Sequence, residues 1–302
     1  MTLTELKYLV AVAQERHFGR AAERCSITQP ALSLAIQKLE DELGGAVFER
    51  RKSEIALTAI GEKIVQQAQR VLEEAEQLKV IAAAGKDQLV GPLRLGVIAT
   101  VGPYLLPELI PILHKRAPRM PLEIEENLTA NLSAMLKHGK LDVVILALPF
   151  DEPGIVTQTL YTEPFHVVVP VTHPWAKKSR IDADQLGREH VLLPHAGHCF
   201  RRQVLEACPE VSRPDAEGIQ GNSLETIRQM VASGLGITVL PCSALTQRHQ
   251  NKRLATVKFV EPVPERAIGL AWRKGFGRLM ALTILRESVQ AVKIPGLEML
   301  KS

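Results

Sequence analysis

Apolar residues recur every three or four positions through the first 43 residues of the chain, which predicts three helices. We expect the first helix to begin with Thr4 as its N-cap residue and to end near Arg16. The second helix should cover residues 20–25. Pro30 lies in the first turn of the third helix, where its missing N–H costs no hydrogen bond, and this helix should end near Leu43. Such an arrangement is typical of a helix-turn-helix, which places its third helix in the DNA major groove.

A hairpin and a long helix should follow the third helix. Apolar residues 46–48 and 55–57 flank a charged run, which predicts a wing, that is, a short β-hairpin with a basic tip. From Thr58 onward, apolar residues recur at steps of three and four for about seven turns. One apolar stripe on so long a helix favours pairing with a second helix, as a dimer on a two-fold operator requires. The stripe comprises Ile60, Ile64, Ala68, Val71, Ala75, Leu78 and Ile81.

The outer face of the third helix and the wing carry the predicted DNA contacts. Side chains near the N-terminus of a recognition helix meet base edges, while hydroxyls and backbone N–H groups hold phosphate. Basic side chains at the wing tip add salt-dependent phosphate contacts. The predicted DNA-binding residues are Gln29, Pro30, Ser33, Leu34, Gln37, Lys38, Arg50, Arg51 and Lys52. The alternative for this part of the chain is a generic three-helix domain with solvated charges.

Apolar, β-branched runs alternate with helical stretches beyond residue 88, which predicts α/β domains with largely parallel sheets. Their length favours two lobes around a cleft. The expected strands cover residues 93–98, 122–125, 141–147, 165–170, 190–193, 236–240 and 267–272. We expect a DNA-binding domain at 1–58, a linker helix with a hinge at 59–88, and an effector domain at 89–302, with lobe I at about 89–162 and 267–302 and lobe II at about 163–266.

Composition and charge narrow the class further. The 302 residues are 46% hydrophobic, no segment approaches the roughly 20 apolar residues of a membrane span, and the start lacks a signal-peptide pattern, so we expect a cytoplasmic protein. The net charge is +4, yet the first 90 residues carry 12 basic and 13 acidic side chains, so DNA binding must depend on local placement of charge. Four cysteines in a reducing compartment leave packing, metal binding or redox chemistry.

Two of these cysteines lie nine residues apart in a segment that predicts a helix, with Cys199 near its start and Cys208 at its end. Helix geometry places their sulfurs roughly 13 Å apart on opposite faces. A disulfide needs Cα atoms within about 7 Å, so oxidation of this pair would require the helix to unwind. A metal site formed with His195 and His198 is an alternative, but the same separation argues against it.

Several motifs resemble those of LysR-type transcriptional regulators. In the N-terminal part these are residues 18–23, 28–33, 36–44, 48–50 and 57–61. The resemblance implies an N-terminal all-α winged helix-turn-helix with a long linker helix, followed by a two-lobed α/β effector domain of the periplasmic-binding-protein type. Further segments resemble the peroxide-sensing branch of this family, namely residues 99–107, 139–147, 173–176, 223–232 and 236–241.

This second resemblance implies that Cys199 is the peroxide-reactive cysteine and Cys208 its resolving partner. The signal would be a reversible thiol–disulfide switch that controls oxidative-stress genes. By resemblance, the Thr100 hydroxyl faces the sulfur across a pocket. The implied peroxide-pocket residues are Thr100, Gly102, Thr129, His198 and Arg266.

The neighbours of Cys199 suit that chemistry. A thiolate attacks peroxide, and an ordinary thiol with a pKa of about 8.5 is mostly protonated near neutral pH. The helix N-terminus and the nearby His198, Arg201 and Arg202 each favour the anion. Arg202 is a departure, because several members of the peroxide-sensing branch carry an acidic residue there. The sulfenic acid product would condense with a neighbouring thiol.

Other interpretations stay open. His198 can cap or pack, Thr100 can cap a helix, and Arg266 can form a surface ion pair. The signal can be a metabolite bound between the lobes, as in most LysR-type regulators. A thiol peroxidase is an enzymatic alternative, although the chain has no C-x-x-C motif.

We therefore expect a regulator that is not an enzyme and that uses no cofactor or metal. Its expected partners are double-stranded operator DNA, hydrogen peroxide, further copies of itself in a dimer of dimers, RNA polymerase and a cytosolic dithiol reductant, with no membrane.

Overall fold

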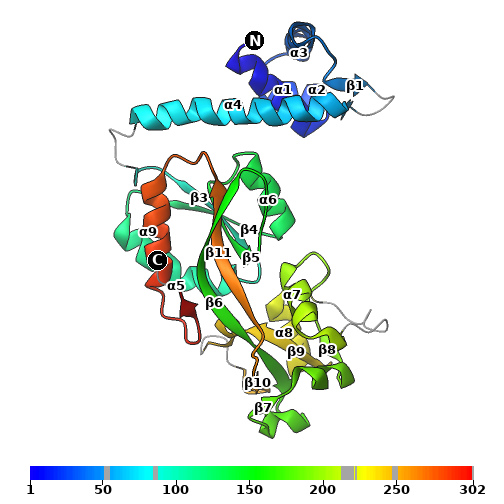
Figure 1. Ribbon diagram of the computed structural model, residues 1–302, viewed down its shortest axis with the longest axis vertical. Helices are drawn as coiled ribbons and strands as arrows, with labels where there is room; N and C mark the ends of the chain where they lie inside the picture. The colour runs from blue at the N-terminus through cyan, green and yellow to red at the C-terminus, as the bar shows by residue number, and fades with distance from the viewer. Residues whose placement is uncertain (51–54, 84–87, 212–220, 222, 247–250, 301–302) are drawn as a thin grey trace. The chain divides into compact units, whose positions relative to one another are not determined.

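The computed structural model describes the whole chain except residues 51–54, 84–87, 212–220, 222, 247–250 and 301–302 (Figure 1). The chain divides into two compact units, Met1–Lys86 and Asp87–Ser302. Each unit has a hydrophobic core of its own.

The N-terminal unit is a winged helix-turn-helix followed by a long helix. Its elements are α1 (Leu3–Glu15), α2 (Phe18–Arg24), α3 (Gln29–Leu43), β1 (Phe48–Arg50), β2 (Ile55–Leu57) and α4 (Ala59–Ala83). The predicted N-cap of α1 was wrong. Thr2 caps this helix instead, because its side chain accepts the Glu5 N–H at 3.2 Å while the Glu5 carboxylate accepts the Thr2 N–H at 2.7 Å, a reciprocal capping box.

Helix α3 begins and ends where the sequence predicts, with Pro30 in its first turn and Gly44 after its last. Gly44 has φ +74°, a left-handed conformation that glycine adopts without strain. The inner face of α3 buries Leu32, Ile36 and Leu39 against α1. The periodicity therefore identified both the helix and its buried face.

The predicted wing and linker helix are also present. β1 pairs antiparallel with β2, and the Thr58 hydroxyl accepts the Gly61 N–H at 2.9 Å at the start of α4. The apolar stripe of α4 divides into two faces. Ala68 packs in the core of its own unit, whereas Ile60 and Leu78 are 59% and 69% exposed.

The C-terminal unit alternates strands and helices. In lobe I and the crossing strands these are β3 (Leu93–Ile98), α5 (Gly102–Arg116), β4 (Leu122–Asn127), α6 (Thr129–Lys137), β5 (Val143–Leu148), β6 (Ile155–Pro170), β11 (Glu265–Arg273), α9 (Leu279–Gln290) and β12 (Glu298–Met299). In lobe II they are β7 (Arg180–Ile181), β8 (Val191–Leu192), α7 (Cys199–Ala207), α8 (Leu224–Ala232), β9 (Ile237–Pro241) and β10 (Leu254–Phe259).

The strands form a mixed sheet, so the prediction of largely parallel sheets was wrong. β3 pairs parallel with β4 and β5, but β11 pairs antiparallel with β5 and β6, and β6 pairs antiparallel with β9 and β10. Figure 1 shows β6 and β11 running side by side from one lobe into the other. β6 pairs with β11 up to Pro164 and with β9 from Phe165, so one 16-residue strand serves both lobes.

Two separate cores define the lobes. The lobe I core gathers β3, β5, α5 and α9, and the lobe II core gathers the second half of β6 with β9, α7 and α8. In the described part of the chain, no helix combines the length and apolar character needed to cross a membrane.

Candidate functional site

Helix α7 holds the two cysteines of interest at its two ends. Cys199 is its first residue and follows the N-cap His198, while Cys208 is the C-cap and donates its backbone N–H to the Val204 carbonyl at 2.8 Å. Both thiols are free. The predicted helix is confirmed, and its rise of about 1.5 Å per residue separates the two cysteines by more than a disulfide can span.

The two thiols also lie in different surroundings. Cys199 is half-buried and packs against the lobe I core, although the rest of α7 belongs to lobe II. Cys208 is 1% exposed within the lobe II core, and this burial, together with the charge of Asp184, raises the pKa of its thiol to about 11. Cys208 is thus a poor nucleophile for as long as α7 keeps it in that core.

The two arginines that follow Cys199 each have a contact of their own. Arg201 donates to the Pro194 carbonyl at 3.3 Å. Arg202 lies 3.6 Å from the Glu206 carboxylate, and both side chains are about two-thirds exposed. The charge of Arg202 is therefore shared with Glu206 at the solvent face of α7.

Thr100 and Arg266 meet in a buried contact between the end of β3 and the start of β11. Thr100 follows β3 and is 2% exposed, and Arg266 lies on β11 and is 3% exposed. The Arg266 guanidinium donates from Nη1 to Thr100 Oγ1 at 3.0 Å and from Nη2 to the Thr100 carbonyl at 2.9 Å. The interpretation of Arg266 as a surface ion-pair residue was therefore wrong.

Gly102 and Thr129 are the first residues of α5 and α6, the helices that follow the paired parallel strands β3 and β4. A Cβ at Gly102, the first residue of α5, would lie 2.4 Å from a carboxylate oxygen of Glu126 and 3.1 Å from Val97 Cγ1, so a larger residue there would displace the Glu126 side chain. Thr129 is the first residue of α6, and its buried Oγ1 has no hydrogen-bond partner among the described residues. A buried hydroxyl that makes no hydrogen bond lowers the stability of the fold. Such a hydroxyl is a candidate to bind a polar ligand.

Contacts around Gly197 connect α7 to the start of α6. A Cβ at Gly197 would lie 2.9 Å from Leu128 Cδ1, so the chain just before Cys199 passes directly beside the residue that precedes Thr129. His198 is 7% exposed and packs edge-on against His195, with ring centroids 5.4 Å apart. Cys199 is the first residue of α7, so it lies at the end of the helix where the backbone N–H groups carry partial positive charge.

Two residues of this site, Glu163 and Phe200, were not predicted from the sequence. Glu163 lies opposite Arg266 in the register of β6 and β11 and forms an ion pair with it at 2.7 Å. Phe200, next to Cys199, lies under the guanidinium of Arg266 at 5.0 Å. The one available signal for Glu163 was a charged residue at the entrance of the apolar run 165–170.

The residues predicted to contact DNA lie on α3 and at the end of β1, as far as the structure describes them. Gln29, Pro30, Leu34 and Gln37 are exposed on α3, and Ser33 is half-buried there. Lys38 is exposed and lies 3.8 Å from the Glu5 carboxylate. Arg50 ends β1, whereas Arg51 and Lys52 are outside the described residues.

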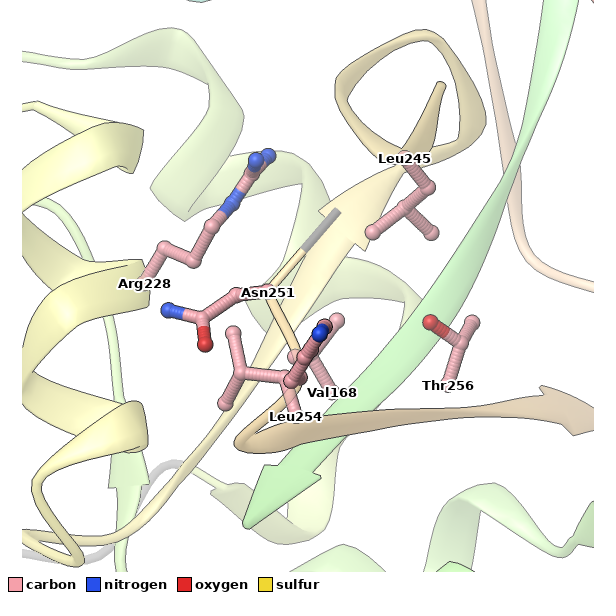
Figure 2. Close-up of a pocket in the computed structure, with 7 residues that line it drawn as sticks. Val168, Arg228, Leu245, Asn251, Leu254 and Thr256 are labelled. Carbon is pink, nitrogen blue, oxygen red and sulfur yellow. The ribbon is translucent and has the colours of Figure 1, made fainter. Parts of the chain in front are cut away.

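A pocket elsewhere in lobe II contains none of the predicted site residues (Figure 2). It is lined by Val168, Arg228, Leu245, Asn251, Lys252, Leu254 and Thr256. All of these belong to lobe II, so this is not the cavity between the lobes that the metabolite alternative requires. Within the described ranges, no group of three or more metal-ligating side chains comes together.

Comparison with known families identifies the class. Residues 3–62 match the model of the bacterial regulatory helix-turn-helix proteins of the lysR family, and residues 86–293 match the LysR substrate binding domain. The chain belongs to the LysR family of transcription regulators.

Its relatives point to one branch of that family. The chain is 39% identical to the DNA-binding transcriptional dual regulator OxyR of Escherichia coli K12 over 291 residues, which cover 96% of this chain and 95% of the relative. It is 40% identical to the hydrogen peroxide-inducible genes activator of Dickeya chrysanthemi, covering 91% and 90% of the two chains.

Solved structures agree with this. A full-length OxyR variant from Pseudomonas aeruginosa matches 100% of this chain and 99% of its own at a TM-score of 0.83 and 49% identity. An H₂O₂-bound OxyR variant from Corynebacterium glutamicum matches 96% and 91% of the two chains at a TM-score of 0.65 and 33% identity.

Proposed function

We propose that this protein is a DNA-binding transcription regulator that senses hydrogen peroxide through reversible oxidation of Cys199 and Cys208, and that it controls oxidative-stress genes. The observation that carries the proposal is the placement of these cysteines. α7 presents one thiol to lobe I and stores the other in the core of lobe II. Oxidation therefore cannot be completed without a change of fold.

The reaction proceeds in two steps. The Cys199 thiolate attacks one oxygen of hydrogen peroxide, so that an S–O bond forms, the O–O bond breaks and hydroxide leaves as water after taking up a proton. The Cys208 thiolate then attacks the sulfenic sulfur, which forms the disulfide and releases a second water molecule. Sulfur gives up two electrons in total, and peroxide is reduced to water.

Side chains around Cys199 supply the polar groups that this chemistry needs. The N-terminus of α7 places partial positive charge beside the reacting sulfur of Cys199. The hydroxyls of Thr100 and Thr129 orient peroxide and stabilise the departing hydroxide, while His198 and Gly102 shape the pocket and Arg266 supports Thr100. A dithiol reductant of the cytoplasm returns the switch to its reduced state.

Refolding of residues 199–208 removes Phe200 and Val204 from the lobe II core and repacks the surfaces that they support. We propose that the chain acts as a dimer of dimers, in which the exposed Ile60, Val71 and Leu78 of α4 pair with a second linker helix. Rearrangement between effector domains then changes the placement of the DNA-binding units and their contact with RNA polymerase.

The DNA-binding unit reads a half-site of the operator through α3. Gln29 and Gln37 contact base edges, Pro30 and Leu34 make apolar contacts, and Ser33 and Lys38 hold the backbone. The basic wing residues Arg50, Arg51 and Lys52 add phosphate contacts that weaken with salt.

Stoichiometric peroxide provides the test. Mass spectrometry of the wild type should show a Cys199–Cys208 bridge at micromolar oxidant, Cys199→Ser should show none, and operator footprints should change only in the wild type. Absence of the bridge would leave a small-molecule effector as the signal. Sustained peroxide consumption with a dithiol reductant would instead indicate a thiol peroxidase.

A further inference from the structure

Glu163 has a fully buried carboxylate, and both of its oxygens accept hydrogen bonds. It is 0% exposed and lies directly opposite Arg266 in the pairing of β6 with β11. One oxygen accepts from Arg266 Nε at 2.8 Å and lies 2.7 Å from Nη2. The other accepts the Ser243 N–H at 3.2 Å and the Cys242 thiol at 4.0 Å. Glu163 is thus held by backbone and cannot turn to follow Arg266.

Arg266 is fixed in turn on three sides. Glu163 holds the Nε edge, the Thr100 carbonyl accepts from Nη2 at 2.9 Å, and the Phe200 ring lies under the guanidinium plane at 5.0 Å. These three contacts fix the orientation of the guanidinium, and so they fix the direction of the fourth contact, the hydrogen bond from Nη1 to Thr100 Oγ1 at 3.0 Å. A guanidinium has a planar fork of donors, so fixing one edge fixes the direction of the others.

The direction of this last hydrogen bond determines where the Thr100 proton points. Arginine has no acceptor, so Thr100 Oγ1 must accept from Nη1, and its own hydrogen is left to be donated elsewhere. Among the described residues, Thr100 Oγ1 donates to no side chain or backbone acceptor. Its proton is available for donation, and the adjacent positive charge makes it a stronger donor. The same guanidinium packs against Phe200, the residue next to Cys199, so the hydroxyl belongs to the surroundings of this cysteine.

We propose that Glu163 is a positioning residue for the peroxide reaction: it holds Arg266 so that Thr100 keeps its hydroxyl proton directed at peroxide. This inference rests on the proposed function and adds to it a residue that no observed contact joins to the reacting sulfur of Cys199; its one sulfur contact is with Cys242. Cys242 takes no part as a nucleophile, because burial and the Glu163 charge raise the pKa of its thiol to about 12. It serves as a neutral donor to Glu163.

The test compares two electrophiles at Cys199 in the full-length protein. Glu163→Gln should lower the second-order rate constant with hydrogen peroxide by about tenfold. The Thr100 hydroxyl, which Glu163 aligns through Arg266, stabilises the leaving hydroxide in the wild type and would be misaligned in the variant. The rate of alkylation by iodoacetamide, which needs no such donor, should change by less than twofold. Equal losses with both reagents would show a merely structural role and overturn the proposal.

A double-mutant cycle places Glu163 in the same chain of contacts as Thr100. In a Thr100→Val background, Glu163→Gln should lower the peroxide rate by less than twofold further, because its effect passes through the Thr100 hydroxyl. Fully additive losses would contradict this. Asp142→Asn is the matched control, since it removes a buried carboxylate from another arginine, Arg94, bound at 2.7 Å, and should leave the peroxide rate within twofold.

Glu163→Asp covers the case in which the uncharged variant fails to fold. It retains the buried charge pair but withdraws the carboxylate by one methylene, and we expect a loss of peroxide rate of several fold with unchanged alkylation. A rate equal to that of the wild type would mean that Glu163 only neutralises Arg266. If the wild type itself forms no bridge between Cys199 and Cys208, the proposed function fails rather than the role of Glu163.

Discussion

Val204→Ala should make the disulfide harder to reduce. The Val204 side chain is 0% exposed and lies in the lobe II core, in the half of α7 remote from Cys199. The reduced protein buries this side chain. The oxidised protein cannot keep it there, because the bridge requires α7 to unwind. A change at Val204 therefore alters the free energy of the reduced state alone.

The magnitude follows from what the substitution removes. Two buried carbons are worth about 1.6 kcal/mol at about 0.8 kcal/mol each, and the residual cavity adds to this. Alanine has a higher helix propensity than valine, which stabilises α7 in the reduced state by about 0.5 kcal/mol. The reduced state should lose about 1.5 kcal/mol in total, which lowers the reduction potential of the two-electron couple by about 30 mV.

Equilibration in dithiol redox buffers, followed by thiol alkylation and mass spectrometry, measures this potential. Glu206→Ala is the matched control on the same helix, because its side chain is exposed and its pairing with Arg202 is worth under about 0.5 kcal/mol, so its shift should stay below about 10 mV. A potential for Val204→Ala equal to or above that of the wild type would refute the reasoning. It would mean that α7 persists in the oxidised state.

Four further outcomes are expected. Cys208→Ser should stop the reaction at a sulfenic acid on Cys199 that a dimedone adduct reveals by mass spectrometry, and a stable thiol after peroxide would contradict the assigned order of attack. Burial raises the pKa of the Cys208 thiol from 9.0 to about 11, so the folded state holds this proton more tightly than the unfolded state does. The free energy of unfolding of the reduced protein should therefore be constant below pH 9 with respect to this group and fall as pH rises to about 11, and Cys208→Ala should lessen the fall in urea titrations. Gln37→Ala should weaken specific operator binding by about 1–3 kcal/mol in a fluorescence titration at fixed salt while leaving binding to unrelated DNA unchanged, and Leu78→Asp should shift the oligomer toward smaller species in sedimentation.

Local patterns predicted the elements that carry the proposed function. Apolar spacing identified α3 and α4, and the chain between Cys199 and Cys208 predicted α7, because helix formation depends on contacts three and four residues apart. The N-cap of α1 shows the limit of such reasoning. Thr2 and Thr4 are both good capping residues, and the reciprocal bonds with Glu5 decide between them.

Pairing of distant strands could not be predicted in the same way. β10 was not predicted at all, and the paired residues of β6 with β10 and β11 lie 84 to 118 residues apart in the chain. The pattern of apolar residues in a strand shows that both of its faces are buried, but it does not show which strand lies beside it or in which direction. The prediction of largely parallel sheets was wrong for this reason.

The separation of the two thiols was thus already contained in the sequence, since a nine-residue helix places its ends too far apart for a disulfide wherever that helix lies. The surroundings of each thiol were decided only by tertiary structure, which turned Cys199 toward lobe I and buried Cys208 in lobe II. The same holds for Glu163, Arg266 and Thr100, which come from three distant segments. A helix is stabilised by its own neighbours in sequence, whereas a buried charge is stabilised by partners that only the folded chain brings within hydrogen-bonding distance.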